Sequence, residues 1–395
     1  MNLSTKILIA LGLGIIAGLQ LGAEGATFAK TWIGPLGTIF MNLIKMVIVP
    51  LVFSSLVMGV CGLGDVKKLG RIGFKTIALY LLTTAFAIAL GIAFGVLVEP
   101  GVGLNMSTEG LKVTAKAAPP IMKVIIDIFP TNPLGAMVKA NMLQIILFAL
   151  FVGVGIVAVG EKAEALKNTI DGLAEVCYKM VAIIMSFAPV GVFGLITPVV
   201  AANGPAVLLP LLKVIICVYV GCILHALIVY GTLVATLGKT SPMGFFKGIA
   251  PASILAFSSC SSSGTLPLTM DCMRKMGVSQ NISSFVLPLG ATINMDGTAL
   301  YQGVCALFVA QIYGVELTGA QYLTIMLTGT LASIGTAGVP GAGFIMLTMI
   351  LTALGLPLEG SALIAGIDRI LDMPRTSVNV TGDAAVTLIV DKSEA

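Results

Sequence analysis

Residues 76–98 contain no charged side chain, and comparably apolar stretches recur along the whole chain. Such stretches must satisfy their backbone hydrogen bonds inside lipid, which only helices and closed barrels do. Barrel strands alternate apolar and polar residues over about ten positions, whereas these runs are longer and do not alternate. Because 57% of the residues are hydrophobic and 10% are charged, we predict an all-α integral membrane protein.

The charged and reactive residues argue against several soluble functions. The net charge is only +4, so the sequence gives no basis for nucleic-acid binding. The seven cysteines lie mostly in apolar runs without a C-x-x-C pair, which is typical of small hydrophobic residues and not of a metal or disulfide framework. His225 is the only histidine, so we interpret it as a core or cavity residue and do not predict an enzyme.

The apolar runs predict eight transmembrane helices. The first run also fits a signal peptide, but further spans follow it instead of a soluble domain, so we interpret it as a helix. A basic cluster follows the second span, and the positive-inside rule places its loop and both termini in the cytoplasm. Proline and asparagine interrupt the fourth span, which we expect to form helical pieces. The predicted spans are 5–22, 36–64, 73–98, 122–160, 168–202, 208–238, 280–313 and a C-terminal span containing 366–383.

Two further apolar segments do not fit a simple alternation of crossings. Residues 249–273 are flanked by Lys and Arg on both sides, so both ends favour the cytoplasm, and the serine-rich stretch 258–267 interrupts them. Residues 319–357 contain no Lys or Arg and are interrupted at 333–343. We predict two re-entrant hairpins that enter from opposite sides. Each precedes a span with Asn and Asp, a pattern typical of inverted repeats around a transporter's binding site.

The C-terminal span carries charges within an apolar run. Four polar residues follow the i, i+4, i+7, i+11 spacing of one helix stripe: Asp368, Asp372, Arg375 and Asn379. A charge at the centre of a spanning helix costs roughly 2.5–3.5 kcal/mol, so the stripe has to face protein, water or a ligand. An Asp and an Arg one turn apart can hold both ends of a zwitterion. The alternative is an internal Asp372–Arg375 salt bridge that only makes the helix insertable.

The tip of the first hairpin is a candidate anion site. Backbone N–H groups from Ser261 to Gly264 would be free at a helix start and could bind a carboxylate. The stretch 335–343 in the second hairpin could do the same or direct carbonyls to a cation. Two alternatives remain: the small residues pack helices together, or a serine is a nucleophile with His225 or a lysine as its base.

Span seven contains a cluster of oxygen ligands. Asn294 and Asp296 lie close to Thr292 and Thr298 in an otherwise apolar run. Carboxylate, carbonyl and hydroxyl oxygens suit a hard cation such as Na⁺, and an aspartate that titrates suits a proton. The pattern does not choose between the two.

Four motifs resemble those of the dicarboxylate/amino acid:cation symporter family. They appear in the family's order and at compatible spacing: SSSGTLP from Ser261, NMDGTALYQG from Asn294, ASIGTAGVPGAG from Ala332 and DMPRTSVNVTGD from Asp372. The resemblance covers the whole chain and implies a homotrimer with an elevator mechanism. It implies scaffold regions at 1–72 (helices 1–2) and 121–203 (helices 4–5), and transport-domain regions at 73–100 (helix 3) and 204–395 (helix 6, hairpin 1, helix 7, hairpin 2 and helix 8).

The resemblance also implies roles for single residues. Asp372 would receive a substrate amine and Arg375 a side-chain carboxylate, while Asn379 and the Ser262 backbone would hold the α-carboxylate. The other implied substrate residues are Ser261, Ser263, Thr298, Val339, Gly343, Asp368 and Thr376. The three implied sodium sites consist of Asp383 with carbonyls of Gly290, Asn294 and Asn379; of Thr292, Ser333, Ile334 and Thr336; and of Tyr80, Thr83, Thr84, Asn294 and Asp296.

Several positions bear on the substrate and the coupled ion. Arg375 fits acidic substrates, because neutral-amino-acid relatives lack this arginine. Asp383 favours Na⁺, because proton-coupled bacterial relatives tend to have asparagine, and Gln302 replaces the glutamate of proton-cotransporting animal members. The chain departs from the family at Cys260 and Met373, where archaeal and animal members respectively carry a further arginine.

Arg369, one turn before Met373, is a candidate for the missing positive charge.

The sequence thus predicts a symporter that couples a Na⁺ gradient to uptake of aspartate or glutamate across the plasma (inner) membrane. A C4-dicarboxylate carrier is an alternative, against which Asp372 argues because a diacid has no amine. A proton-coupled glutamate symporter and an anion-conducting channel or sensor are the others.

Overall fold

The computed structural model describes residues 3–61, 66–104, 106, 126, 129–139, 141–334, 338 and 341–394. Every regular element within these ranges is helical. The first part contains α1 (Leu3–Phe28), the π-helical turn η1 (Ala29–Ile33), α2 (Gly34–Cys61), α3 (Val66–Val98), α5 (Pro133–Val138), α6 (Met142–Val159), the 3₁₀ turn η2 (Gly160–Ala163), α7 (Glu164–Ser186) and α8 (Ala188–Asn203).

The second part contains both predicted hairpin regions and the C-terminal helix. Its elements are η3 (Gly204–Val207), α9 (Leu208–Leu224), the π-helical turn η4 (His225–Tyr230), α10 (Gly231–Thr236), α11 (Pro242–Ser259), α12 (Ser262–Lys275), α13 (Gln280–Ile293), α14 (Asp296–Ile312), α15 (Gly319–Ser333), α16 (Ala342–Leu354), η5 (Leu358–Gly360) and α17 (Ser361–Glu394). Helix pairs α11–α12 and α15–α16 stand at the positions of the two expected hairpins and pack within each pair.

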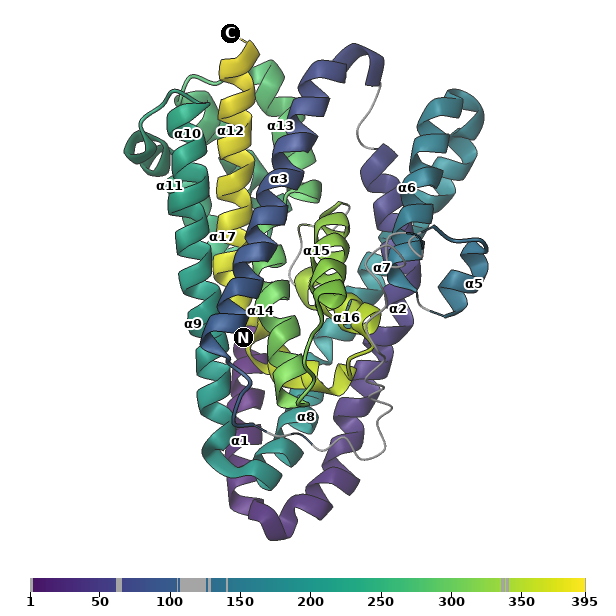
Figure 1. The fold of residues 1–395 in the computed structure, drawn as a ribbon, viewed down its shortest axis with the longest axis vertical. Coiled ribbons are helices and arrows are strands. Elements are labelled where there is room, and N and C mark those ends of the chain that lie inside the picture. The colour runs from purple at the N-terminus through teal and green to yellow at the C-terminus, as the bar shows by residue number, and fades with distance from the viewer. Residues whose placement is uncertain are drawn as a thin grey trace.

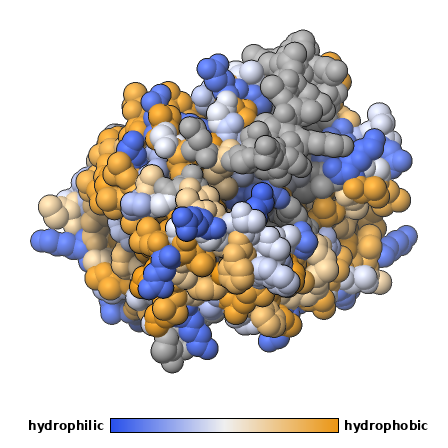
Figure 2. Space-filling model, turned by 90° about the horizontal axis from the view of Figure 1, so that it is seen from below, coloured by the Kyte–Doolittle hydropathy of each residue, from blue (hydrophilic) through white to orange (hydrophobic). Residues whose placement is uncertain are grey.

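The length and apolarity of the helices suit a membrane. Among the described residues, three helical stretches are long and apolar enough to span one: Ile9–Phe40, Arg71–Val98 and Gly204–Thr236. Shorter apolar helices include Ala188–Ala202 and Ala342–Leu354. Seen from the end opposite the C-terminus, apolar side chains cover much of the outer surface (Figure 2). The prediction of a helical membrane protein is thus supported, while the number of eight spans stays a prediction.

Two expectations need correction. The backbone leaves the helical conformation at Gly22, with a φ of 57°, where the first span was predicted to end, but residues 23–35 form helix and not the expected loop. Glycine tolerates this φ because it has no Cβ. The single span expected at 280–313 is broken between α13 and α14, because Asn294 and Met295 leave the helical conformation.

The helices pack in two groups. Helices α1, α2, α6, α7 and α8 contact one another, and α3, α9 and α11 to α17 assemble around α14 and α17 (Figure 1). The groups meet where α8 and α1 contact α17, and where α2 and α6 contact α16. The expected division into scaffold and transport regions, and their relative motion, stay predictions.

Glycine makes the contact between α3 and α14 possible. A Cβ on Gly91 would lie 2.1 Å from the carbonyl oxygen of Leu300. Small residues let membrane helices approach closely enough for backbone contact. The α3 helix is therefore held against the helix that begins at the polar Asp296.

Helix α17 continues through Pro374 although proline cannot donate the helical hydrogen bond. The carbonyl that loses its partner belongs to Ile370, four residues earlier. The hydroxyl of Tyr219 in α9 donates to this oxygen at 3.1 Å. A neighbouring helix therefore satisfies the freed carbonyl, as membrane proteins require.

Candidate functional site

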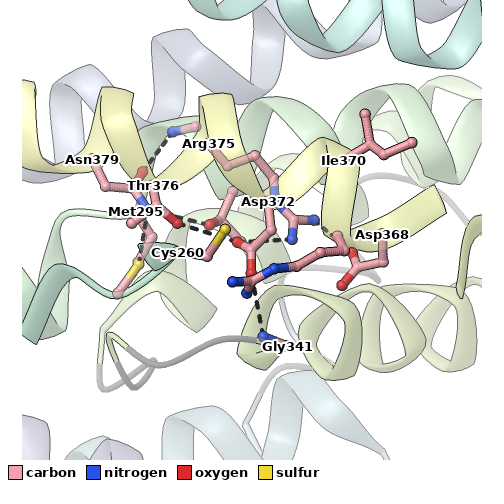
Figure 3. A network of polar contacts seen from close by, with 12 residues as sticks. Cys260, Met295, Gly341, Asp368, Ile370, Asp372, Arg375, Thr376 and Asn379 are labelled. Carbon is pink, nitrogen blue, oxygen red and sulfur yellow. Dashed lines mark hydrogen bonds and ion pairs between the residues drawn. The ribbon is translucent and has the colours of Figure 1, made fainter. Parts of the chain in front are cut away.

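A buried ionic cluster occupies the middle of α17. The Arg375 side chain is 0% exposed, and its Nη1 donates to Oδ1 of Asp368 at 2.9 Å (Figure 3). Its Nη2 lies 3.0 Å from Oδ1 of Asp372. The guanidinium carbon stands 3.9 Å from the centre of the Tyr301 ring, a cation–π contact. The internal salt bridge considered as an alternative is therefore present, and it includes Asp368 as well.

The Nε and Nη2 groups form the open edge of the guanidinium, which carries a single ion pair. Among the described residues, Nε has no hydrogen-bond partner, and Nη2 has only the ion pair with Asp372. Buried donors without partners are rare, and each costs about 1–3 kcal/mol. A carboxylate binds arginine through two parallel N–H groups. The open edge of Arg375 has the donors for such a contact.

Asp372 connects α17 to the start of α16. Its Oδ2 accepts a hydrogen bond from the backbone N–H of Gly341 at 3.3 Å, and its Oδ1 accepts one from the Thr376 hydroxyl at 3.2 Å. Gly341 has a left-handed φ of 85°, which glycine adopts at little steric cost because it has no Cβ. The second hairpin is therefore attached to the ionic cluster.

The tips of the two hairpins touch. The Ser261 hydroxyl donates to the Gly338 carbonyl at 2.9 Å, and the Ser263 N–H donates to the same oxygen at 3.2 Å. Ser261 also caps α12 by accepting a bond from the Gly264 N–H at 3.0 Å. The Ser261 N–H donates to the Ser259 hydroxyl at 3.3 Å, so the expectation of free N–H groups is wrong for Ser261, Ser263 and Gly264 in this conformation. The N–H of Ser262 donates to no described residue.

A small cavity lies between the tips and α17. Its volume is about 10 Å³, roughly room for one water molecule. The lining residues are Cys260, Ser262, Met295, Thr298, Gly338, Ala342, Gly343, Asp372, Thr376 and Asn379. An amino acid does not fit this volume, so the structure has a closed site. The predicted Val339 and Thr336 lie outside the described residues.

The broken helix of span seven meets α17 through amides and a carboxylate. The Asn294 Nδ2 donates to Oδ1 of Asp383 at 2.9 Å and to the Asn379 carbonyl at 3.1 Å. A Cβ on Gly290 would lie 2.5 Å from Oδ1 of Asp383. The four residues expected around one cation are thus brought together. Asn379 also accepts a bond from the Gly297 N–H at 2.8 Å through its Oδ1.

Asp296 lies in a polar pocket between α3, η4 and α14. Its Oδ1 accepts a bond from the Thr84 hydroxyl at 2.6 Å. Its Oδ2 accepts one from the Tyr230 hydroxyl at 2.7 Å and lies 3.1 Å from Nε2 of His225. A π-helical turn has i→i+5 hydrogen bonds, and the rings of His225 and Tyr230, five residues apart, lie on the same side with their centres 4.9 Å apart. The sequence interpretation of His225 as a polar cavity residue agrees with this position.

The other residues of the implied cation sites are less closely joined. On α3, Thr83 donates to the Tyr80 carbonyl at 3.1 Å, and Tyr80 donates to the Val286 carbonyl at 3.1 Å. Thr292 and Ser333 each donate to a carbonyl of their own helix, at 3.0 and 2.7 Å. Ile334 ends α15. No hydrogen bond links Thr292, Ser333 and Ile334 within the described ranges, so this site stays a prediction.

The buried charges do not balance. The described residues include four buried aspartates and one buried arginine, and only Asp368 and Asp372 are paired with that arginine. Asp296 and Asp383 have neutral donors around them, apart from a histidine that is charged only when protonated. An unpaired buried carboxylate is costly unless a cation or proton compensates it. The site therefore favours the binding of cations or protons.

Sequence reasoning missed three contacts at this site. Tyr301 belongs to the quoted motif NMDGTALYQG but was not assigned to Arg375, although it is one turn after Thr298. Tyr230 was not considered at all, since no local pattern connects it to Asp296. Arg369 donates from Nη2 to the Ser259 carbonyl at 3.2 Å, at the end of α11. The positive charge of Arg369 thus lies beside the first hairpin tip, next to Cys260, where archaeal relatives carry an arginine.

Comparisons with known proteins cover almost the full length of the chain. Residues 3–393 match the family described as the sodium:dicarboxylate symporter family. The chain is 39% identical to the proton/sodium-glutamate symport protein of Geobacillus stearothermophilus, covering 100% of this chain and 94% of the relative. It is also 39% identical to the proton/glutamate-aspartate symporter of Escherichia coli (100% and 93%). A C4-dicarboxylate transport protein of Bacillus subtilis is 33% identical (100% and 94%).

Proposed function

This chain belongs to the sodium:dicarboxylate symporter family, so it is a membrane transporter and not an enzyme, and we propose that it couples entry of aspartate or glutamate to a Na⁺ gradient. The observation that carries the proposal is the fully buried Arg375 with one open edge, in a site that holds more carboxylates than cations. The relatives named for glutamate are 39% identical and the one named for C4-dicarboxylates is 33% identical, which supports an acidic amino acid as substrate.

Substrate binding exchanges one carboxylate for another at Arg375. The side-chain carboxylate of the substrate binds the open Nε and Nη2 edge and displaces Asp372 from the guanidinium. Asp372 then accepts the substrate's ammonium group, so that neither charge stays unpaired. The α-carboxylate binds the Ser262 N–H and the Asn379 amide. Asp368 stays on Nη1 and keeps the guanidinium oriented. The internal salt bridge is in this view the resting state of the receptor, and not an alternative to it.

Entry of the substrate requires the hairpin tips to separate. The second hairpin is attached through the Gly341 N–H to Asp372, and through the Gly338 carbonyl to Ser261 and Ser263. Moving Asp372 toward the substrate breaks the first of these contacts, which links substrate binding to hairpin movement. The Gly338 contacts then re-form when the hairpin closes over the bound amino acid.

The cations compensate the remaining carboxylates. We place one Na⁺ at Asp383 with carbonyls of Gly290, Asn294 and Asn379, where the Asn294 amide now bridges two of these oxygens. A second Na⁺ lies at Asp296 and Thr84, with Tyr80, Thr83 and Asn294. The third set consists of Thr292, Ser333, Ile334 and Thr336. The transporter works as a homotrimer in the plasma membrane with both termini in the cytoplasm, and regions 73–100 and 204–395 move as an elevator against 1–72 and 121–203.

Uptake into proteoliposomes tests the substrate and the ion together. We expect an inward Na⁺ gradient to concentrate radiolabelled aspartate or glutamate, and unlabelled aspartate to compete better than succinate. Choline in place of Na⁺, with an inward pH gradient, is the control for proton coupling. Uptake driven by the pH gradient alone would replace Na⁺ by H⁺ in the proposal. Stronger competition by succinate would instead favour the C4-dicarboxylate alternative that the relative from Bacillus subtilis raises.

A further inference from the structure

Helices α3 and α17 lie side by side (Figure 1), and residues of both helices line an apolar groove. The groove has a volume of about 370 Å³, and none of its lining residues belongs to the Arg375 cluster. The lining residues are Phe74, Lys75, Ala78, Leu79, Leu82, Leu237, Ile389, Val390 and Ser393. Leu82 is 64% exposed and Phe74 is 74% exposed, so the groove is open to its surroundings. In a membrane protein, those surroundings are lipid chains.

One end of the groove is basic. Arg71, Lys75, Ala78 and Leu82 share a stripe of α3, because they follow the i, i+4, i+7, i+11 spacing. The stripe passes from two cations to the apolar wall of the groove. Arg71 and Lys75 lie where α3 begins and α17 ends, at the same end of the molecule (Figure 1). This end also holds Glu394, which pairs with both.

Glu394 pairs with both cations but leaves them donors for a further anion. Lys75 donates from Nζ to Oε1 of Glu394 at 2.7 Å and to the Ser393 hydroxyl at 3.0 Å. Hydrogen bonds from Lys75 and Arg71 keep the pKa of the Glu394 carboxyl below its usual 4.5, so it is ionised at neutral pH. Arg71 pairs with the same carboxylate, yet its side chain is 74% exposed. An arginine has five N–H donors, so most of those of Arg71 face outward.

The charge at this end is positive overall. Besides Arg71 and Lys75, the exposed Lys392 lies in the last turn of α17. The acidic side chains are Glu394 and Asp391, and Oδ1 of Asp391 accepts a hydrogen bond from the Ser279 N–H at 3.0 Å. Cations therefore outnumber carboxylates beside the mouth of an apolar groove.

We propose that this groove binds a phospholipid with an anionic headgroup, whose phosphate contacts Arg71 and whose acyl chain lies along Ala78 and Leu82. A headgroup with a net negative charge is favoured because the cations Arg71, Lys75 and Lys392 repel the ammonium group that a zwitterionic headgroup carries beside its phosphate. An acyl chain is needed because a free phosphate leaves the groove unfilled. Basic residues next to a membrane helix attract anionic lipids of the cytoplasmic leaflet. The bound lipid bridges α3 and α17 beside their ion pairs.

Lipid retention by the purified full-length protein tests the proposal. Native mass spectrometry after mixing with equal amounts of phosphatidylglycerol and phosphatidylcholine reports which lipid stays bound, and the unfolding midpoint in each lipid reports stabilisation. We expect the wild type to retain phosphatidylglycerol preferentially. Arg71→Gln should weaken that retention about fivefold, the usual contribution of one basic residue near an anionic surface. Ala78→Phe fills the groove and should weaken it without a change of charge.

Two further variants distinguish a lipid site from a purely structural ion pair. Arg274→Gln removes an arginine that is likewise exposed and paired with an aspartate, and it should leave retention unchanged. Glu394→Gln removes the carboxylate but keeps both cations, so retention should be equal to or stronger than that of the wild type. Glycerol phosphate, a headgroup without chains, should not raise the unfolding midpoint. Equal retention of the two lipids by the wild type, or unchanged retention in both Arg71→Gln and Ala78→Phe, would overturn the proposal.

Discussion

Replacing Arg375 by glutamine separates its role as a counter-ion from its role as a receptor. The substitution leaves Asp368 and Asp372 in a buried site without the cation that now lies 2.9 and 3.0 Å from them. Breaking a buried ion pair by removing one partner costs about 3–5 kcal/mol. We therefore expect Arg375→Gln to lower the unfolding midpoint of the purified protein strongly, whatever its role in transport.

The double variant Asp368→Asn/Arg375→Gln restores the charge balance. The wild-type cluster has two carboxylates and one guanidinium, and the double variant has one carboxylate, so both carry a single net negative charge. Asp372 keeps its hydrogen bonds from Gly341 and Thr376. We expect the double variant to regain much of the lost stability. If Arg375 were only a counter-ion, transport would return together with stability.

As a receptor, Arg375 gives the substrate two charge-assisted hydrogen bonds. Each is worth about 1.5–3 kcal/mol, so their loss should raise the apparent KM for aspartate by roughly 10² to 10⁴-fold. The measurement is Na⁺-driven aspartate uptake by the stable double variant, with Asp368→Asn alone as the control that retains the arginine. Aspartate uptake by the double variant with a KM within about threefold of that of Asp368→Asn would refute the receptor role.

Three other substitutions test separate parts of the structure. Gly91→Ala should destabilise the protein by about 1–3 kcal/mol, because the new Cβ would lie 2.1 Å from a carbonyl oxygen of α14. Gly172→Ala is the control, because a Cβ there meets open space and should not destabilise the protein. The unfolding midpoints of both variants measure the difference. Asp383→Asn should raise the Na⁺ concentration for half-maximal aspartate uptake at least tenfold, because it removes the only charged ligand of the Na⁺ site proposed at Asp383. An unchanged Na⁺ dependence would contradict this role. Arg369→Gln loses the contact with the Ser259 carbonyl and a charge beside the first hairpin tip. It should raise the KM for aspartate severalfold with little change in the unfolding midpoint. Equal KM values for the variant and the wild type would limit Arg369 to a structural contact.

The sequence predicted those features of the site that depend on one helix. The spacing of Asp368, Asp372 and Arg375 determines their common stripe, because any α-helix brings residues three, four and seven apart together. The family resemblance stated from four motifs is confirmed by the match over residues 3–393. The helical class followed from the same reasoning, because long apolar runs leave the backbone no other way to be satisfied in lipid.

Features that depend on contacts between helices were not predictable in this way. The break at Asn294 is an example: hydropathy continues across it, and the extended backbone is held by the side chain's bonds to α17. The partners of Asp296 come from α3 and η4, and the π-helical turn that aligns His225 with Tyr230 has no local sequence signal. The direct contact of the two hairpin tips likewise joins residues that are more than seventy positions apart.

Among the described residues, few hydrogen bonds hold the second hairpin tip in its closed position, and this suits a transporter. They are the bonds of Ser261 and Ser263 to the Gly338 carbonyl and that of Gly341 to Asp372. A net contribution of about 1 kcal/mol for each gives roughly 3 kcal/mol. Conformations separated by a few kcal/mol interconvert with a populated minor state, and a ligand shifts them only by its differential affinity. An amino acid that takes Asp372 away from Gly341 has that differential affinity, because its ammonium group competes for the same carboxylate that holds the hairpin closed.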